Sequence, residues 1–79
     1  MWHLEGFDRE TEELVQEPRL PKLDASTIRR VLKVYDDLPI EPFTFEIPNR
    51  EALYELAKYG DEPIKIDESL QYFLAFYTD

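Results

Sequence analysis

The feature that most constrains this fold is one segment, Phe43–Gly60, in which a strand pattern is followed directly by a helix pattern. Its first apolar residues, Phe43, Phe45 and Ile47, alternate with polar ones. Successive side chains of a strand point to opposite faces, so this strand would have one apolar face and one polar face. We expect it to be the centre of a sheet, with strands from both ends of the chain beside it.

A helix is predicted immediately after this strand. Asn49 follows a proline and is a preferred N-cap, because its side-chain oxygen can accept a hydrogen bond from the first helical turn. Leu53 and Leu56 have the spacing of one apolar helix face. Gly60 is suited to end the helix in a left-handed conformation. The pattern therefore predicts a helix over Asn49–Tyr59.

Two further elements are predicted before this segment. Residues 1–17 predict a β-hairpin, since two short strand patterns flank a polar loop. Pro18 and Pro21 would then end the hairpin and begin an extended linker. Asp24 or Ser26 is suited to be the N-cap of a helix. We expect this helix to end at Asp36-Asp37. The apolar stripe of that helix consists of Ile28, Val31, Leu32 and Tyr35.

The last apolar run, Leu70–Tyr77, is compatible with two structures. Four of its residues have helical spacing, and Asp67 could cap such a helix. Short aromatic-rich runs favour strands, however, and a strand buried on both faces needs no alternation. We favour the strand and keep the helix as the alternative.

These segments predict a single domain, residues 1–79, of the α+β class in the order β-β-α-β-α-β. Two helices would pack on one face of a four-stranded sheet. If the strand at 43–47 and the strand at 70–77 are parallel, the helix between them forms a right-handed crossover.

Charge excludes several classes of function. The 79 residues carry a formal net charge of −9, and residues 41–79 hold nine acids but only three bases. Binding to nucleic acid or to an anionic membrane needs basic patches, so both are disfavoured. A basic protein partner is favoured instead, because attraction between opposite charges speeds the encounter.

The cellular location is predicted from features that the sequence does not contain. The sequence has no cysteine, which fits a reducing compartment. The first residues do not combine a basic region with an apolar run, as a signal peptide would. No apolar stretch is long enough to cross a bilayer. We expect a cytoplasmic protein.

The sequence predicts no catalytic, cofactor or metal site. His3 is the only histidine, and neither a nucleophile motif nor a set of metal ligands accompanies it. Asp61 and Asp67 lack the spacing of a calcium loop. The two glycines are too few and too far apart for a phosphate-binding loop.

The candidate partner-binding residues are carboxylates and one tyrosine. They lie on the outer face of the helix over 49–59 and in three acidic pairs at turns or helix ends. Solvated caps and turns are the simpler interpretation of those pairs, whereas tyrosine is enriched in interface hot spots. The candidates are Glu51, Tyr54, Glu55, Asp61, Glu62, Asp67, Glu68, Asp36 and Asp37.

Short motifs near both ends of the chain allow one comparison with a known family. The motifs are Trp2 with Phe7-Asp8, Glu13-Leu14-Val15, and Asp67 with Tyr72-Phe73-Leu74. On these motifs the chain resembles a family of small bacterial proteins known only as a domain of unknown function. Small acidic bacterial proteins of this kind are often immunity proteins, which neutralise a cognate toxin. The resemblance implies that function but assigns no functional residues.

Three functions follow from these observations, in decreasing order of support. The first is an immunity-type inhibitor that blocks the cationic site of a basic toxin with carboxylates and tyrosines. The second is a structural or oligomeric accessory protein, with a homodimer formed through a sheet edge or the aromatic terminus. The third is an enzyme that uses paired carboxylates, and the absence of a catalytic motif disfavours it.

Overall fold

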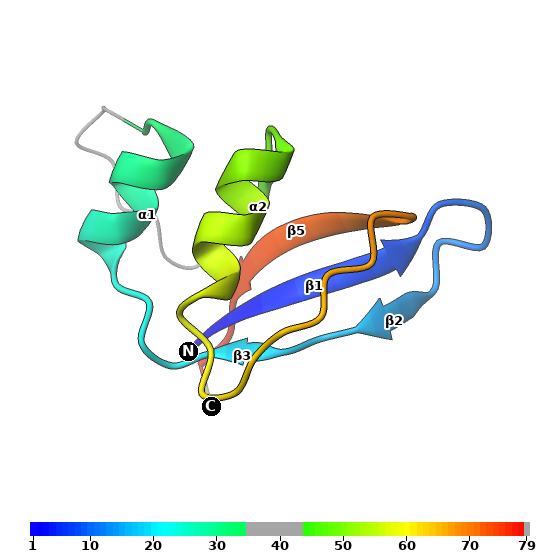
Figure 1. Ribbon diagram of the computed structural model, residues 1–79, viewed down its shortest axis with the longest axis horizontal. Helices are drawn as coiled ribbons and strands as arrows, with labels where there is room; N and C mark the ends of the chain where they lie inside the picture. The colour runs from blue at the N-terminus through cyan, green and yellow to red at the C-terminus, as the bar shows by residue number, and fades with distance from the viewer. Residues whose placement is uncertain (35–43, 79) are drawn as a thin grey trace.

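The computed structural model describes residues 1–34 and 44–78, which form two helices and a five-stranded antiparallel sheet (Figure 1). This arrangement confirms the α+β class, and the last element is a strand rather than the alternative helix. The elements in chain order are β1 (Trp2–Asp8), β2 (Leu14–Gln16), β3 (Arg19–Leu20), α1 (Ala25–Leu32), β4 (Thr44–Glu46), α2 (Arg50–Ala57) and β5 (Leu70–Phe76).

The centre of the sheet is formed by β1 and β5, which come from opposite ends of the chain. The strand order is β2-β1-β5-β4, and β3 also pairs with β1. The expectation that the strand after residue 43 is central is therefore wrong, because β4 is an edge strand of three residues. It pairs antiparallel with β5, so the handedness rule for parallel crossovers does not apply. Pro48, which cannot donate to a ladder, follows β4 closely.

The fifth strand, β3, lies where the sequence predicted a linker. Leu20 pairs with Trp2 and Arg19 pairs with His3, so β3 extends the edge that β2 begins. The flanking prolines, Pro18 and Pro21, are compatible with this position because an edge strand can leave one side of its backbone unpaired. These prolines therefore flank an edge strand of the sheet and do not mark the point where the sheet ends and a linker begins.

The caps of both helices explain where the helices begin. The side chain of Asp24 accepts a hydrogen bond from the Thr27 amide at the start of α1, and Asn49 accepts one from Ala52 at the start of α2. The first helix is shorter than predicted, because Lys33 has a left-handed conformation (φ 56°) directly after Leu32. Tyr35, the last residue of the predicted stripe, lies outside the described residues.

The role predicted for Gly60 is wrong. Neither glycine of the chain has a positive φ, and α2 ends through Lys58 in a right-handed conformation. Gly60 is needed for space instead, because a Cβ atom there would lie 2.8 Å from Ile64 Cδ1. The chain after α2 thus packs closely against the last turn.

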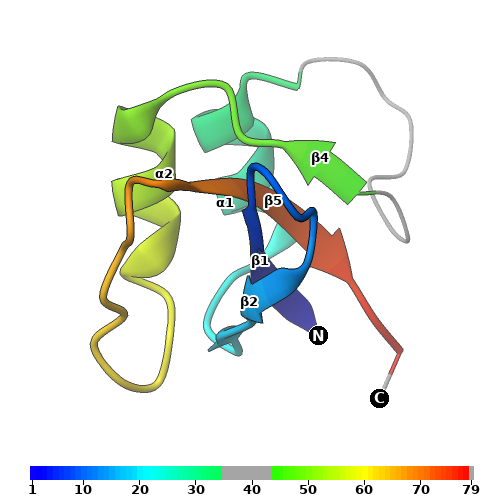
Figure 2. The ribbon, with the colours of Figure 1, turned by 90° about the vertical axis from the view of Figure 1, so that its right-hand side faces the viewer.

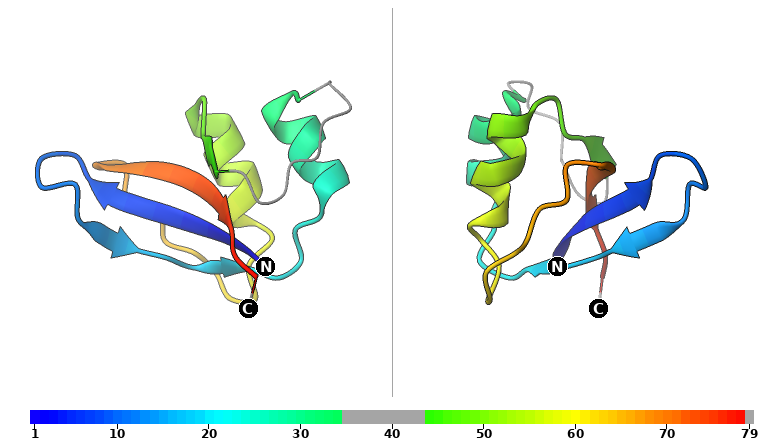
Figure 3. Two further views of the ribbon diagram at one scale, coloured as in Figure 1. Left: turned by 180° about the vertical axis from the view of Figure 1, so that it is seen from behind. Right: turned by 45° about the vertical axis from the view of Figure 1, so that its right-hand side comes forward.

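Alternation along the two central strands separates the two faces of the sheet. Trp2, Leu4 and Gly6 of β1 lie opposite Phe76, Leu74 and Tyr72 of β5 on the face that the helices cover (Figure 2). Both helices lie on this one side of the sheet, as predicted (Figure 3). The largest fully buried side chains of the core are Leu4, Leu20, Ile28, Leu56 and Leu74.

The segment between α2 and β5 covers the rest of this face. Ile64 and Ile66 pack against the core, and the chain runs beside β2 before it enters β5 (Figure 1). Gln16 fixes the segment to β2, because its Nε2 donates to the Lys65 carbonyl over 2.9 Å. The Asp67 amide donates to Tyr72 Oη over 2.9 Å. The turn that leads into β5 is therefore held by side chains of the sheet itself.

We predict that Gly6→Ala destabilises the domain more than Gly60→Ala. A Cβ at Gly6 would lie 2.9 Å from Tyr72 Cε1, and the Tyr72 ring is fixed through its hydroxyl. We expect a loss of about 1–3 kcal/mol in the free energy of unfolding for Gly6→Ala. At Gly60 the nearest atom is the end of the flexible Ile64 side chain, so the loss should be below about 1 kcal/mol. Urea denaturation followed by circular dichroism measures the free energy of unfolding of both variants. Equal losses would contradict the inference that the fixed Tyr72 ring leaves less room at Gly6 than Ile64 leaves at Gly60.

Candidate functional site

The outer face of α2 carries three of the predicted partner-binding residues. Ala52, Leu53 and Leu56 are buried, so positions on the opposite side of the helix face solvent. Glu51 and Tyr54 are exposed there, and Tyr54 keeps 45% of its surface accessible. Glu55 is half-buried, and its Oε2 lies 3.1 Å from Lys58 Nζ. The helix pattern in the sequence placed these three side chains correctly.

Two more predicted residues, Asp67 and Glu68, lie in the turn before β5, and an ion pair of Glu68 joins that turn to the first turn of α2. Glu68 forms an ion pair with Arg50, the first residue of the helix. Asp67 lies beside Tyr72, because the Asp67 amide donates to Tyr72 Oη over 2.9 Å. Burial raises the pKa of the Tyr72 hydroxyl, although this hydrogen bond acts to lower it. We call the set Glu51, Tyr54, Glu55, Asp67 and Glu68 the α2 patch.

The remaining predicted residues are not part of this patch. Asp61 and Glu62 follow the other end of α2 and line a cleft of ≈ 370 Å³ together with Pro18 and Arg19. A helix of eight residues is about 12 Å long, so the two acidic groups are separated by the length of α2. Asp36 and Asp37 lie outside the described residues.

Hydrogen bonds to local donors keep several carboxylates ionised. The Ser69 hydroxyl and amide both donate to Asp67 Oδ1 and lower the pKa of Asp67. Backbone amides lower the pKa of Asp8 in the hairpin loop and of Asp24 at the helix cap in the same way. A general acid near neutral pH needs a raised pKa, so these three carboxylates fit an anionic surface better than acid catalysis.

The described ranges, 1–34 and 44–78, contain no group of three His, Cys, Asp or Glu side chains that could hold a metal ion. No helix in the same ranges is both long and apolar enough to span a membrane.

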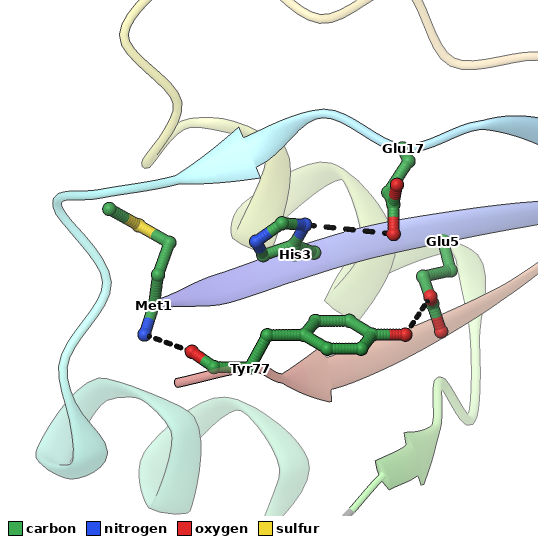
Figure 4. A network of polar contacts seen from close by, with 5 residues as sticks. All are labelled: Met1, His3, Glu5, Glu17 and Tyr77. Carbon is green, nitrogen blue, oxygen red and sulfur yellow. Dashed lines mark hydrogen bonds and ion pairs between the residues drawn. The ribbon is translucent and has the colours of Figure 1, made fainter. Parts of the chain in front are cut away.

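A second polar cluster lies on the sheet face opposite the helices, and the sequence analysis did not find it (Figure 4). Glu5 of β1 is only 7% exposed, and the Tyr77 hydroxyl donates a short hydrogen bond to its carboxylate. The register of β1 with the β2 edge places Glu17 opposite Glu5. His3 Nδ1 lies 3.7 Å from Glu17 Oε2, and the ring of His3 meets the ring of Tyr77 edge to face.

This cluster holds the two ends of the chain together. The amino group of Met1 donates to the Tyr77 carbonyl over 2.9 Å, and the Tyr77 amide donates to the Met1 carbonyl over 3.0 Å. These bonds continue the ladder of β1 and β5 by one residue pair and place the Tyr77 ring over β1. The buried side chain of Glu5 thereby has a hydroxyl donor, as a buried polar group requires. We interpret the cluster as a structural clasp.

Tyr77→Phe should remove an alkaline phase of unfolding. The hydrogen bond to Glu5, with burial, raises the pKa of Tyr77 to about 12. An unfolded tyrosine ionises near pH ~10, so this bond stabilises the domain fully below pH ~10 and is lost as the pH rises towards ~12. The variant should lose about 1 kcal/mol at pH 7 and show a weaker pH dependence between those values. Urea titrations at pH 7 to 12 measure this, with Tyr54→Phe on the exposed face of α2 as the control; an unchanged alkaline profile in Tyr77→Phe contradicts the clasp.

Comparison with known proteins adds the family of the chain. Searches of curated proteins gave no match, and searches of solved structures gave none either. The family model of the domain of unknown function DUF7683 matches residues 1–75, which is nearly the whole chain and includes the motifs at both ends. The chain therefore belongs to the DUF7683 family of proteins of unknown function.

Proposed function

We propose that this chain is a non-catalytic binding protein that recognises a basic protein through the α2 patch. In its most specific form, the proposal is an immunity-type inhibitor that covers the cationic site of a cognate toxin. The observation that carries the proposal is an exposed tyrosine, Tyr54, on the same outer helix face as Glu51 and Glu55, with Glu68 ion-paired to the first residue of that helix.

The chemistry of the patch suits a cationic surface. Tyrosine gives a large contact area with little loss of conformational entropy, and it is frequent in hot spots. Asp67 is fixed in its turn by two hydrogen bonds from Ser69. A surface that is already ordered before binding loses less entropy on association. The net charge of −9 would also steer a basic partner towards the protein from a distance.

An inhibitor is favoured over an enzyme because the patch offers charge and shape without acid–base chemistry. The pKa of Asp67, the patch carboxylate with a clear shift, is lowered, which keeps it anionic. Carboxylates on the exposed face of a helix and in the turn beside it can pair with lysine and arginine side chains in a cleft that normally binds an anionic substrate. Tyr54 would then fill the apolar part of that cleft.

A homodimer through a sheet edge is the less supported alternative. The β4 edge has only three residues, and the opposite edge, formed by β2 and β3, is interrupted at Pro18, so both edges suit the addition of a further strand poorly. The β2 edge is also irregular, because its register with β1 shifts between Gly6 and Phe7. Two copies with a net charge of −9 would repel each other as well.

The proposal predicts that binding depends on the position of the charges and not only on their number. The partner is first isolated by affinity capture at low salt and purified, and its Kd is then measured by calorimetry. Glu51→Gln with Glu55→Gln should weaken the complex about 10-fold, whereas Glu10→Gln with Glu13→Gln in the exposed hairpin loop should change it less than about 2-fold. Tyr54→Ala should weaken it by about 10-fold or more. Raising the salt concentration should weaken the wild-type complex most.

Two results would contradict the proposed function. One is capture of no basic protein at low salt. The other is equal weakening by the two charge-matched double variants, which would mean that only net charge matters. If the captured partner is a toxic enzyme, wild-type protein should inhibit its activity and Tyr54→Ala should not, which tests the inhibitor form directly.

A further inference from the structure

A cleft adjoins the α2 patch and shares Asp67 and Glu68 with it. It has a volume of ≈ 550 Å³ and lies between β2 and the segment that enters β5. Clefts of this size can enclose a small ligand or a long side chain with its neighbours. The cleft is lined by Val15, Gln16, Lys65, Ile66, Asp67, Glu68 and Leu70.

An irregularity in β2 directs Val15 into this cleft. Gly6 and Phe7 are adjacent in β1, yet their partners in β2 are Gln16 and Leu14, so Val15 is an extra residue in the edge strand. Such a bulge changes the direction in which a side chain points. Val15 is 60% exposed, more than any other large apolar side chain of the described residues. Core packing therefore does not explain why a valine occupies this position.

The walls of the cleft are apolar and fixed. Ile66 packs against the core, and Leu70 is buried at the start of β5. Gln16 is held from both ends of its amide: its Oε1 accepts from Tyr72 Oη over 2.5 Å, and its Nε2 donates to the Lys65 carbonyl over 2.9 Å. An apolar group could lie on Val15 and Ile66 without a rearrangement of the chain.

The rim of the cleft carries two acidic side chains, Asp67 and Glu68, and two cations, Lys65 and Arg50, compete for them. Both hydrogen bonds from Ser69 reach Asp67 Oδ1, so the second carboxylate oxygen can serve a further donor. Glu68 forms an ion pair with Arg50, but both side chains are largely exposed, and exposed pairs contribute little and exchange easily. Lys65 lies close enough to lower the pKa of Asp67.

We propose that this cleft binds an arginine or lysine side chain of the basic protein partner. The aliphatic stem would lie on Val15 and Ile66, and the cationic group would lie between Asp67 and Glu68. Arginine and lysine are the side chains that combine a long apolar stem with a positive head, so they match an apolar wall with an acidic rim. The inference rests on the proposed function, because it names the residue type with which the partner is anchored.

The experiment is an NMR titration of the methyl groups with two small probes. N-acetyl-arginine methylamide carries the charge, and N-acetyl-citrulline methylamide has nearly the same shape without it. The arginine probe should shift the methyl signals of Val15 and Ile66 with a Kd of about 1–10 mM, and the citrulline probe should bind at least about 5-fold more weakly. Equal shifts with both probes, or shifts elsewhere only, would overturn the assignment.

Variants separate the contributions of the wall and the rim. Val15→Ser and Glu68→Gln should each weaken the arginine probe about 3-fold or more, whereas Lys65→Gln and Arg50→Gln should strengthen it, because each removes a competing cation. Leu14→Ser is the matched control, since Leu14 is also exposed on β2 but does not line the cleft. Loss of affinity in the control to the same extent as in Val15→Ser would contradict the proposed wall.

The same variants distinguish this inference from the proposed function. If the partner binds Val15→Ser as tightly as wild type while Tyr54→Ala weakens it, the cleft is not an anchor but the α2 patch still binds. If no basic partner exists, the proposed function fails. The inference that the cleft anchors an arginine or lysine of such a partner is then overturned as well, even if the cleft binds the arginine probe.

Discussion

The fold depends on one long pairing, between the first and last strands of the chain. β1 and β5 are in register over seven residue pairs, from Trp2 opposite Phe76 to Asp8 opposite Leu70. All other strands pair with one of these two, and both helices pack on the face that this pair defines. The pairing brings together residues about 70 positions apart, so it forms at a considerable cost in loop entropy. Aromatic contact between Trp2 and Phe76 on one face, and the clasp of Glu5 with Tyr77 on the other, offset part of that cost.

This pairing also positions the candidate binding surface. Arg9 follows β1 and donates to the carbonyls of Ser69 and Leu70 over 3.2 and 3.3 Å, which fixes the turn before β5. Asp67 and Glu68 lie in that turn, and Glu68 joins it to α2 through Arg50. The turn that carries Asp67 and Glu68 is therefore held by Arg9, a residue about 60 positions away in the sequence.

Local patterns predicted every element except β3, because the information for the others lies within a few residues. Alternation indicated β4, the side chain of Asn49 indicated the start of α2, and aromatic content indicated a strand in the run that became β5. The same patterns could not predict the strand order, because a strand of three residues and a strand of seven look alike locally. For the site, the helical face of Glu51, Tyr54 and Glu55 was predictable. The approach of Glu68 to Arg50, the burial of Glu5 under Tyr77 and the bulge at Val15 all depend on pairing between distant segments.

The negative charge of this chain serves the fold and the candidate function together. Asp8, Asp24 and Asp67 each accept hydrogen bonds from amides of their own turn or cap, which lowers the pKa of each one. A lowered pKa means that these carboxylates stabilise the folded state above the pKa of the unfolded chain, and that this contribution disappears as the pH falls through the folded pKa. The same protonation would remove the field that attracts a cation. A small domain that turns its chain with aspartates therefore gains an anionic surface without extra residues, and Asp67 is the position where the turn and the surface coincide.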